Sequence, residues 1–167
     1  MTALNFVLSP DFVSLVSDTL CTVGPENKPC FYSSKVHAVP HLHCAFTMTG
    51  QGFFALECLK SLMVRIIARD VLEADEDIPK LYKELWQEHL EKREAEGTDM
   101  SNAKATVYHF GWVRSKGRVF GFEYKAENGF ASERIGDGCW MHPNTVPNIT
   151  VREPADLVRI TKKQKKM

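Results

Sequence analysis

Residues 46–63, FTMTGQGFFALECLKSLM, contain the point at which the hydrophobic pattern changes from that of strands to that of a helix. The break itself is Gly50-Gln51-Gly52. Beyond it the apolar residues recur every three or four positions, and this period predicts a helix over residues 53–71 that packs one face against a sheet. The expected apolar face comprises Phe54, Cys58, Leu62 and Ile66.

The part of the chain before this break is predicted to form strands. Residues 3–8 and 12–18 are apolar runs separated by Ser9-Pro10-Asp11, which is a turn signal, and we therefore expect a hairpin. Two further strands are expected in residues 31–39 and 42–48.

The part of the chain after the first helix is predicted to form a second helix and then strands. Asp77 is a favourable cap for this helix, Pro79 lies in its first turn, and Gly97 marks its end. Strict alternation of side chains then predicts strands over residues 106–113 and 118–124.

The last third of the chain contains one strong turn signal. Asn128-Gly129 predicts a hairpin that leads into residues 130–135. Residues 140–154 contain three prolines and are expected to be irregular, whereas residues 155–161 are expected to form a short helix. The basic residues 162–167 are expected to be a solvated tail.

Strands, then two helices, then strands again indicate an α+β fold in which the helices pack on a sheet. We expect a single domain over residues 1–154, followed by a short C-terminal segment, residues 155–167, that carries the basic tail.

The composition excludes several classes of protein. The 167 residues are 44% hydrophobic and 25% charged, and the net charge is zero, which argues against a general nucleic-acid or membrane-surface binder. No apolar run is long enough to span a membrane, and no secretory signal is visible. The five cysteines are scattered without a C-x-x-C pair. We therefore expect a cytoplasmic protein with reduced thiols and without a metal or cofactor.

The second residue suggests a reaction. Removal of Met1 would leave Thr2 at the N-terminus, with a hydroxyl nucleophile and a free α-amine on one residue. The reference pKa of such an amine, about 7.7–8.0, lies near the range that a general base needs. This pairing of threonine and amine is a known form of activated nucleophile.

Four further positions extend this signal into a pattern. After Thr2, Asp18 follows in LVSDTLCTVG, Lys35 in SSKVHAV and Gly50 in FTMTGQGFF, and Asp137 lies in the late Gly136-Asp137-Gly138. In this order and spacing the chain resembles the proteasome-type N-terminal nucleophile (Ntn) hydrolases, and it is similar to the HslV-like threonine peptidase subunit of bacteria. The resemblance covers roughly residues 2–138.

The chain departs from the family pattern at three positions. Ala3 stands where a second threonine is frequent, Gln51 replaces the second glycine of the glycine-rich break, and Asp137 replaces a serine. The family also continues with two more helices, whereas few residues remain here. The resemblance therefore implies an Ntn-hydrolase-like antiparallel β-sandwich with helices on the outer face, C-terminally truncated, with its second helical layer reduced or missing.

The resemblance also implies a mechanism. Thr2 would attack a carbonyl, its own amine would take the proton, and Lys35 would keep that amine neutral by charge repulsion. Asp18 would hold Lys35, because a buried ammonium needs a partner. The backbone N–H of Gly50 would stabilise the oxyanion, and Asp137 would contact the amine. The reaction would cleave an amide, in the first instance a peptide bond, through a Thr2 acyl-enzyme.

Other interpretations of the same residues stay open. The chain could be a catalytically inactive proteasome-like scaffold or assembly protein, or a hydrolase of small amides. We expect a homo-oligomer, and the resemblance raises the question of an ATPase partner. Four neighbouring residues could suit a metal or a thiol nucleophile, although a structural role is favoured. These residues are His37, His41, His43 and Cys44. The aromatic residues of 106–124 are expected in the core or at a subunit interface.

Overall fold

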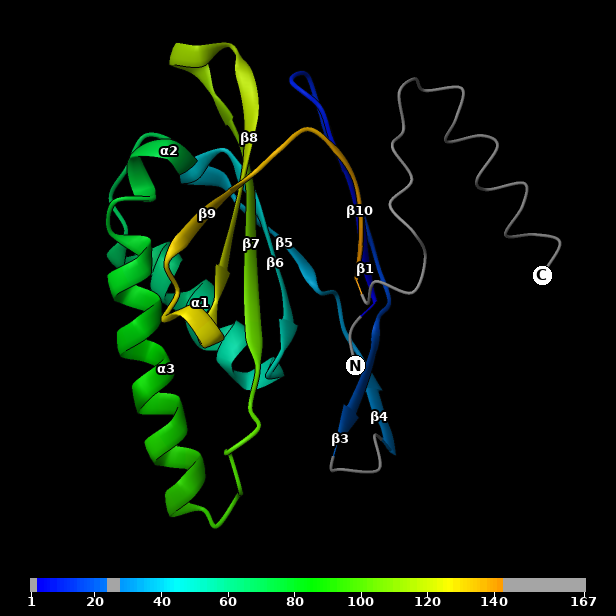
Figure 1. Ribbon diagram of the computed structural model, residues 1–167, viewed down its shortest axis with the longest axis vertical. Coiled ribbons are helices and arrows are strands. Elements are labelled where there is room, and N and C mark those ends of the chain that lie inside the picture. Colours follow the sequence, from blue (N-terminus) through cyan, green and yellow to red (C-terminus); the bar gives the residue numbers. More distant parts are fainter. Residues whose placement is uncertain (1–2, 24–27, 143–167) are drawn as a thin grey trace, which may run out of the picture.

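The computed structural model describes residues 3–23 and 28–142, and its elements follow one another in the order of strands, helices and strands (Figure 1). The strands are β1 (Leu4–Leu8), β2 (Val13–Ser17), β3 (Leu20–Val23), β4 (Lys28–Tyr32), β5 (Val36–Val39), β6 (Cys44–Gly50), β7 (Ala105–Val113), β8 (Arg118–Lys125), β9 (Ser132–Ile135) and β10 (Gly138–His142). The α-helices are α1 (Gly52–Arg65), α2 (Val71–Ala74) and α3 (Ile78–Ala95). Short 3-10 turns are η1 (Pro40–Leu42), η2 (Arg114–Lys116) and η3 (Ala126–Asn128).

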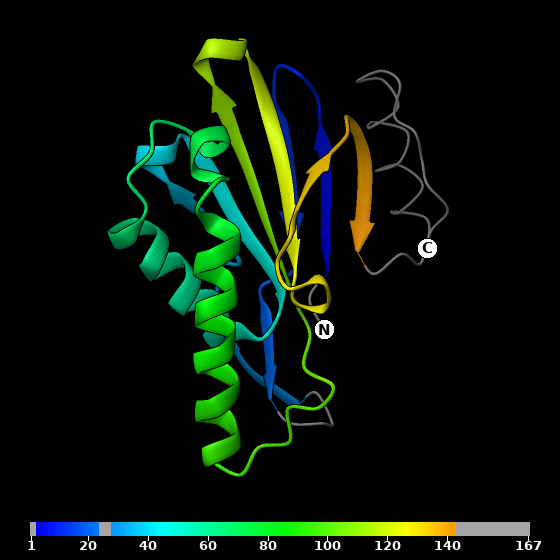
Figure 2. The same ribbon diagram turned by 60° about the vertical axis from the view of Figure 1, so that its left-hand side comes forward.

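The strands form three antiparallel groups. The large sheet has five strands in the order β5-β6-β7-β8-β9, and the small sheet has three in the order β10-β1-β2. Strands β3 and β4 pair only with each other and form a two-stranded arm. The helices lie on one side of the large sheet and the small sheet lies on the other (Figures 1 and 2).

The helices cover the large sheet with their apolar faces. Phe54, Cys58 and Leu62 of α1 are fully buried and belong to one apolar cluster with residues of α2, α3 and the large sheet. The side chain of Asp70 caps α2 by accepting hydrogen bonds from the backbone N–H groups of Leu72 and Glu73. This cluster is the main core of the protein.

A second apolar cluster joins the two sheets. Alternate residues of β1 are buried, which places three side chains of the small sheet against the large one. The cluster comprises Leu4, Phe6, Leu8, Tyr108, Phe110, Val119 and Ile135. On the outer face of the small sheet no helix lies among the residues that the structure describes.

The structure confirms the α+β class and the expected hairpins. Strands β1 and β2 pair antiparallel with Leu8 opposite Val13 around the predicted turn, and β8 pairs with β9 across Asn128-Gly129. Gly129 has a φ of 67°, a conformation that glycine adopts without strain.

Three boundaries expected from the sequence were wrong. The strand over residues 31–39 is interrupted, because Ser33, Ser34 and Lys35 separate β4 from β5. Helix α1 ends at Arg65 because Ile66, although buried, is extended, and an apolar pattern does not distinguish the two conformations. Residues 140–142, which were expected to be irregular, belong to β10, since β1 supplies their hydrogen-bond partners. The short helix expected at 155–161 and the basic tail lie outside the described residues.

Candidate functional site

A carboxylate and an ammonium group meet at one end of the small sheet. Asp18 follows β2 and Lys35 precedes β5, and the Lys35 Nζ lies 2.9 Å from the Asp18 Oδ2. The same ammonium donates to the carbonyl oxygen of Leu20 over 2.7 Å. Only 13% of the Lys35 side chain is exposed, against 31% of that of Asp18. The pair is therefore more shielded from water than a surface salt bridge.

Asp18 also holds the N-terminal strand. Its Oδ1 accepts a hydrogen bond from the backbone N–H of Ala3 over 2.9 Å, and its own N–H donates to the Ala3 carbonyl over 3.1 Å. Thr2 lies outside the described residues. The structure thus brings together Asp18, Lys35 and the residue that follows Thr2.

Gly50 lies at the same end of the molecule. In the register of the large sheet Val36 is opposite Thr47, so the start of β5, next to Lys35, lies beside the last residues of β6. Gly50 is the last residue of β6 and has a φ of 105°, which strains any residue with a side chain. A Cβ atom here would also overlap the carbonyl oxygen of Lys104. Glycine is therefore required at this position.

Asp137 lies at the other end. Its carboxylate pairs with the Arg118 guanidinium at 2.7 and 3.0 Å. Its neighbour Gly138 is opposite Leu8, four residues along β1 from Leu4, or about 13 Å at the usual strand rise. Strand β10 runs antiparallel to β1, and its first residues therefore lie far from the N-terminus. The structure does not bring Asp137 to Asp18 and Lys35.

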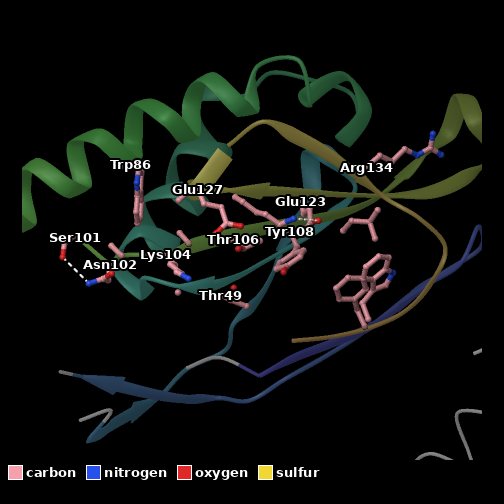
Figure 3. Close-up of a pocket in the computed structure, with 18 residues that line it drawn as sticks. Thr49, Trp86, Ser101, Asn102, Lys104, Thr106, Tyr108, Glu123, Glu127 and Arg134 are labelled. Carbon is pink, nitrogen blue, oxygen red and sulfur yellow. Dashed lines mark hydrogen bonds and ion pairs between the residues drawn. The ribbon is translucent and has the colours of Figure 1, made fainter. Parts of the chain in front are cut away.

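A pocket opens between the two sheets next to Gly50 (Figure 3). Its volume is about 580 Å³. Thr49, Thr106 and Tyr108 of the large sheet line it together with Phe6 and Trp140 of the small sheet, and further lining residues come from α3 and the loop before β7. The pocket adjoins the proposed oxyanion donor, which makes it the candidate substrate site.

Apart from Gly50, the sequence analysis did not assign a functional role to the residues that line the pocket. Lys125 of β8 pairs with Glu123 at 2.9 Å and with Glu133 at 3.1 Å, and both Lys125 and Glu123 line the pocket. Burial, and then the charge of Glu123, raises the pKa of Tyr108 to about 12, so that its hydroxyl stays protonated. On β8 the signal was the polar side of the alternation, Glu123 and Lys125, whereas on β7 Thr106 shares a face with aromatic residues and was interpreted with them.

The residues around His43 do not have the arrangement that a metal site or a thiol nucleophile needs. The His43 Nδ1 lies 3.3 Å from the carbonyl oxygen of Arg69, and burial raises the pKa of Cys44 to about 12, far from that of a reactive thiolate. Among residues 3–23 and 28–142, no three His, Cys, Asp or Glu side chains are grouped to hold a metal ion.

A second titratable cluster lies on the helix side of the large sheet. The ring of His109 is fully buried, its Nε2 is 2.6 Å from the Tyr82 hydroxyl, and burial lowers its pKa to about 3. Nearby, the Tyr124 hydroxyl donates to the Asp75 carboxylate over 2.6 Å. This cluster is sealed by the helices and belongs to the core.

Comparison with known proteins finds similar solved structures. No protein-family model matches the chain, and no curated protein matches it. A solved structure, Anbu (ancestral beta-subunit) from Yersinia bercovieri, matches 95% of this chain and 70% of its own length with a TM-score of 0.62 and 11% sequence identity. In the described part of the chain, no helix is both long and apolar enough to cross a membrane.

This similarity corrects the resemblance drawn from the motifs. The matched solved structure is an ancestral beta-subunit, and neither a family model nor a curated relative supports assignment to the HslV-like threonine peptidases. That assignment was wrong because glycines, an aspartate and a lysine at similar spacing are typical of a shared fold. They do not identify one protein family among those that have this fold. At 11% identity the likeness to Anbu shows the fold alone.

Proposed function

We propose that the chain is an N-terminal threonine hydrolase that cleaves amide bonds, in the first instance peptide bonds, through a Thr2 acyl-enzyme. The fold consists of a layer of helices, the large sheet and the small sheet. We interpret the two sheets and their helices as the sandwich of an N-terminal nucleophile hydrolase. The fold likeness to a beta-subunit supports this interpretation, and the chemistry rests on the end of the sheets at which Asp18 and Lys35 lie.

The observation that carries the proposal is the position of the Lys35 ammonium. An ammonium has three N–H donors, and two acceptors among the described residues are within reach, the Asp18 carboxylate and the Leu20 carbonyl. The same carboxylate accepts a hydrogen bond from the Ala3 N–H, and the Asp18 N–H donates to the Ala3 carbonyl, which together hold the residue after Thr2 beside Asp18. The third donor is then available for the hydroxyl of Thr2.

The proposed reaction has two steps. The Thr2 hydroxyl oxygen bonds to the carbonyl carbon while its proton passes to the Thr2 α-amine, and the C–N bond breaks as that proton reaches the leaving nitrogen. Water then attacks the ester, the acid is released, and the hydroxyl of Thr2 is restored. Lys35 stabilises negative charge on the attacking oxygen, and the N–H of Gly50 is the proposed oxyanion donor. Asp137 has no part in this proposal, because it pairs with Arg118 at the other end.

The test is the intact mass of the protein, made without a tag at its N-terminus, before and after treatment with an electrophile selective for N-terminal threonine. We expect loss of Met1 and one adduct that maps to Thr2, together with strongly reduced labelling in Lys35→Ala. Asp137→Asn is the matched control and should label as the wild type does. A retained Met1, or a free Thr2 that never reacts, would exclude the threonine hydrolase.

A second candidate function is that of a non-catalytic scaffold, and the outer face of α1 favours it. Side chains at helical spacing on this face point away from the core, with 68% of Phe53 and 73% of Val64 exposed, and Ile67, which follows the helix, is 97% exposed. The exposed apolar residues are Phe53, Leu56, Met63, Val64 and Ile67. A stable interface buries roughly 800 Å² on each partner, and an exposed apolar group of this kind is suited to form its centre.

We propose a second copy of the chain as the partner of this face. Light scattering after gel filtration should show an oligomer for the wild type and a monomer for the Val64→Lys/Ile67→Lys variant. Lys83→Glu on the exposed side of α3, which lies outside this face and removes no apolar surface, is the control. Oligomers that persist in the double variant would place the interface elsewhere. If Thr2 fails to react while the oligomer depends on α1, the scaffold is the better description.

A further inference from the structure

The end of the large sheet next to Gly50 carries two residues of opposite charge. The carbonyl group of Lys104 lies so close to Gly50 that a Cβ atom there would overlap it. On the next strand pair Thr106 is opposite Lys125, and Lys104 and Glu127 each lie two residues beyond this pair, at the same edge of the sheet. Both residues line the pocket between the two sheets (Figure 3).

Neither of these two charges is neutralised by the described part of the protein. Lys104 has no carboxylate partner and Glu127 has no cationic partner among residues 3–23 and 28–142, and the two side chains form no ion pair with each other. Both side chains are exposed at the rim of the pocket. The rim therefore offers an ammonium and a carboxylate that a ligand can contact.

The other charged residues that line the pocket are already engaged. Lys125 contacts Glu123 at 2.9 Å and Glu133 at 3.1 Å. Arg134 has no carboxylate partner in the described ranges, but its guanidinium lies 4.4 Å from the centre of the Phe120 ring, which belongs to the main core under the helices. In Figure 3 this guanidinium points away from Glu123. The two charges at the rim therefore remain for a ligand.

The space next to the two charges suits a small organic ligand. The pocket has a volume of about 580 Å³, which lies in the range of small-molecule sites. Its apolar part includes Trp86 and the Trp140 indole, which is stacked on Phe6 with ring centroids 6.1 Å apart. The hydroxyl groups of Thr49 and Thr106 line the same space and can exchange hydrogen bonds with a peptide group.

The sign of the two charges selects the ligand. A ligand with a carboxylate alone would pair with Lys104 but bring a second negative charge close to Glu127, and a ligand with an ammonium alone would meet the opposite conflict. A neutral ligand would gain from neither charge. A ligand that carries both an ammonium and a carboxylate pairs with both residues and adds no net charge to the site.

We propose that this pocket binds a short peptide with both termini free, such as a dipeptide. The carboxylate of the peptide pairs with Lys104, and its ammonium group pairs with Glu127. Because Lys104 adjoins Gly50, the peptide bond between the two termini lies near the proposed oxyanion donor. As a statement about substrate this inference rests on the proposed hydrolase, which would then act on short peptides rather than within long chains.

Binding is measured without relying on catalysis. The three tryptophan indole N–H signals of a ¹⁵N-labelled sample are assigned with tryptophan-to-phenylalanine variants. They are followed during titration with alanyl-alanine, its N-acetyl form, its C-terminal amide and the form that is blocked at both ends. We expect the signals of Trp86 and Trp140 to shift, whereas Trp112, which lies outside the pocket, should not respond. Each block should weaken binding about fivefold, since the rim charges are partly screened by water.

Two crossed variants test the role of each charge. Lys104→Met should remove the preference for a free carboxylate and keep the preference for a free amine, and Glu127→Gln should do the reverse. Because each variant keeps half of the selectivity, a loss of folding cannot produce this pattern. Lys116→Met and Glu94→Gln make the same changes of charge at exposed residues outside the pocket, and both should keep both preferences.

The outcomes separate the pocket from the reaction. Selective binding of the free dipeptide with an unreactive Thr2 would support the pocket and exclude the hydrolase. A reactive Thr2 with equal binding of the four peptides would exclude the proposed ligand and leave the hydrolase in place. The pocket would also be overturned if no peptide shifted the Trp86 and Trp140 signals, or if Lys116→Met changed the selectivity as much as Lys104→Met.

Discussion

The Asp18–Lys35 and Arg118–Asp137 ion pairs lie at opposite ends of the paired sheets, and they differ in what they hold. At the N-terminal end Lys35 is 13% exposed and its partner Asp18 also bonds the backbone of Ala3. At the other end Arg118 and Asp137 are 31% and 44% exposed, and their contact closes a surface turn. Both aspartates were marked by the sequence pattern, yet only Asp18 is built into the start of the chain.

The difference between the two ion pairs shows how a candidate functional site is distinguished from a surface contact in the same protein. Exposed ion pairs contribute little free energy because water screens them, whereas a shielded pair with further hydrogen bonds fixes the direction of its donors. Polar residues also face the pocket near Gly50, whereas apolar residues fill the space near Leu8. Variants that affect the two ends equally would break this comparison.

Glycine substitutions near the site are expected to have the largest effect. Gly50→Ala adds a Cβ in a strained backbone conformation and against the Lys104 carbonyl, and we expect a loss of about 3 kcal/mol in the free energy of unfolding. Gly52→Ala is the control, because its Cβ would point into open space at the start of α1 and should change stability by less than about 1 kcal/mol. Urea unfolding measures both. Equal losses would show that Gly50 is not specifically required.

Replacing the two cations is expected to have the next largest effect. Lys35→Met leaves the shielded Asp18 carboxylate without its partner and should lower the free energy of unfolding by about 2 kcal/mol, less than for a fully buried pair. Arg118→Met should cost no more than about 1 kcal/mol.

The same two variants sharpen the chemical side of the comparison. Labelling of Thr2 should slow by about a hundredfold in Lys35→Met and stay unchanged in Arg118→Met. Pseudo-first-order labelling rates from intact mass measure this. Two variants that label alike would contradict the assignment of Lys35.

Much of the fold was predictable because its periods are long and regular. The helical period around Phe54 and the alternation of β7 each persist over many residues, and the layers follow from them. Strand β10 was not predictable, since Gly138–His142 is too short to show a period and depends on pairing with β1. Short segments take their structure from tertiary partners, which a local pattern does not contain.

The candidate site was predictable only in part. The resemblance implied that Asp18 holds Lys35, and the structure places the two side chains in contact at one end of the sheets. The same reasoning failed to place Asp137, since the direction of β10 depends on long-range pairing. The polar residues that line the pocket were missed because Thr106, for example, alternates with core residues and looks like an ordinary strand position.

A smaller effect is expected on the pH dependence of stability. It distinguishes the buried His109 in the core from the ion pairs at the two ends of the sheets. The pKa of His109 in the folded protein, about 3, lies below its ordinary value of 6.5, so the unfolded chain binds a proton that the folded protein does not. The stability that the neutral ring provides is present above pH 6.5 and decreases by about 1.4 kcal/mol per pH unit as the pH falls toward 3. His109→Gln should reduce this slope by about one proton, measured by unfolding at several pH values. An unchanged slope would mean that the ion pairs at the ends dominate the response to acid.

The smallest effect is expected from the exposed carboxylate, and it is also the most direct test of the comparison. Asp137→Asn removes one partner of an ion pair that water already screens, and the amide can still accept a hydrogen bond from Arg118, so the free energy of unfolding should change by about 0.5 kcal/mol or less. Asp18→Asn removes the same charge but weakens the contacts to both Lys35 and Ala3, and it should slow labelling of Thr2, whereas Asp137→Asn should leave the rate unchanged. If Asp137→Asn slowed labelling as much as Asp18→Asn, a carboxylate about 13 Å along the strand would be acting on the N-terminus. The distinction between the two ends would then have to be abandoned, because screening at the Arg118 pair leaves no electrostatic route over that distance.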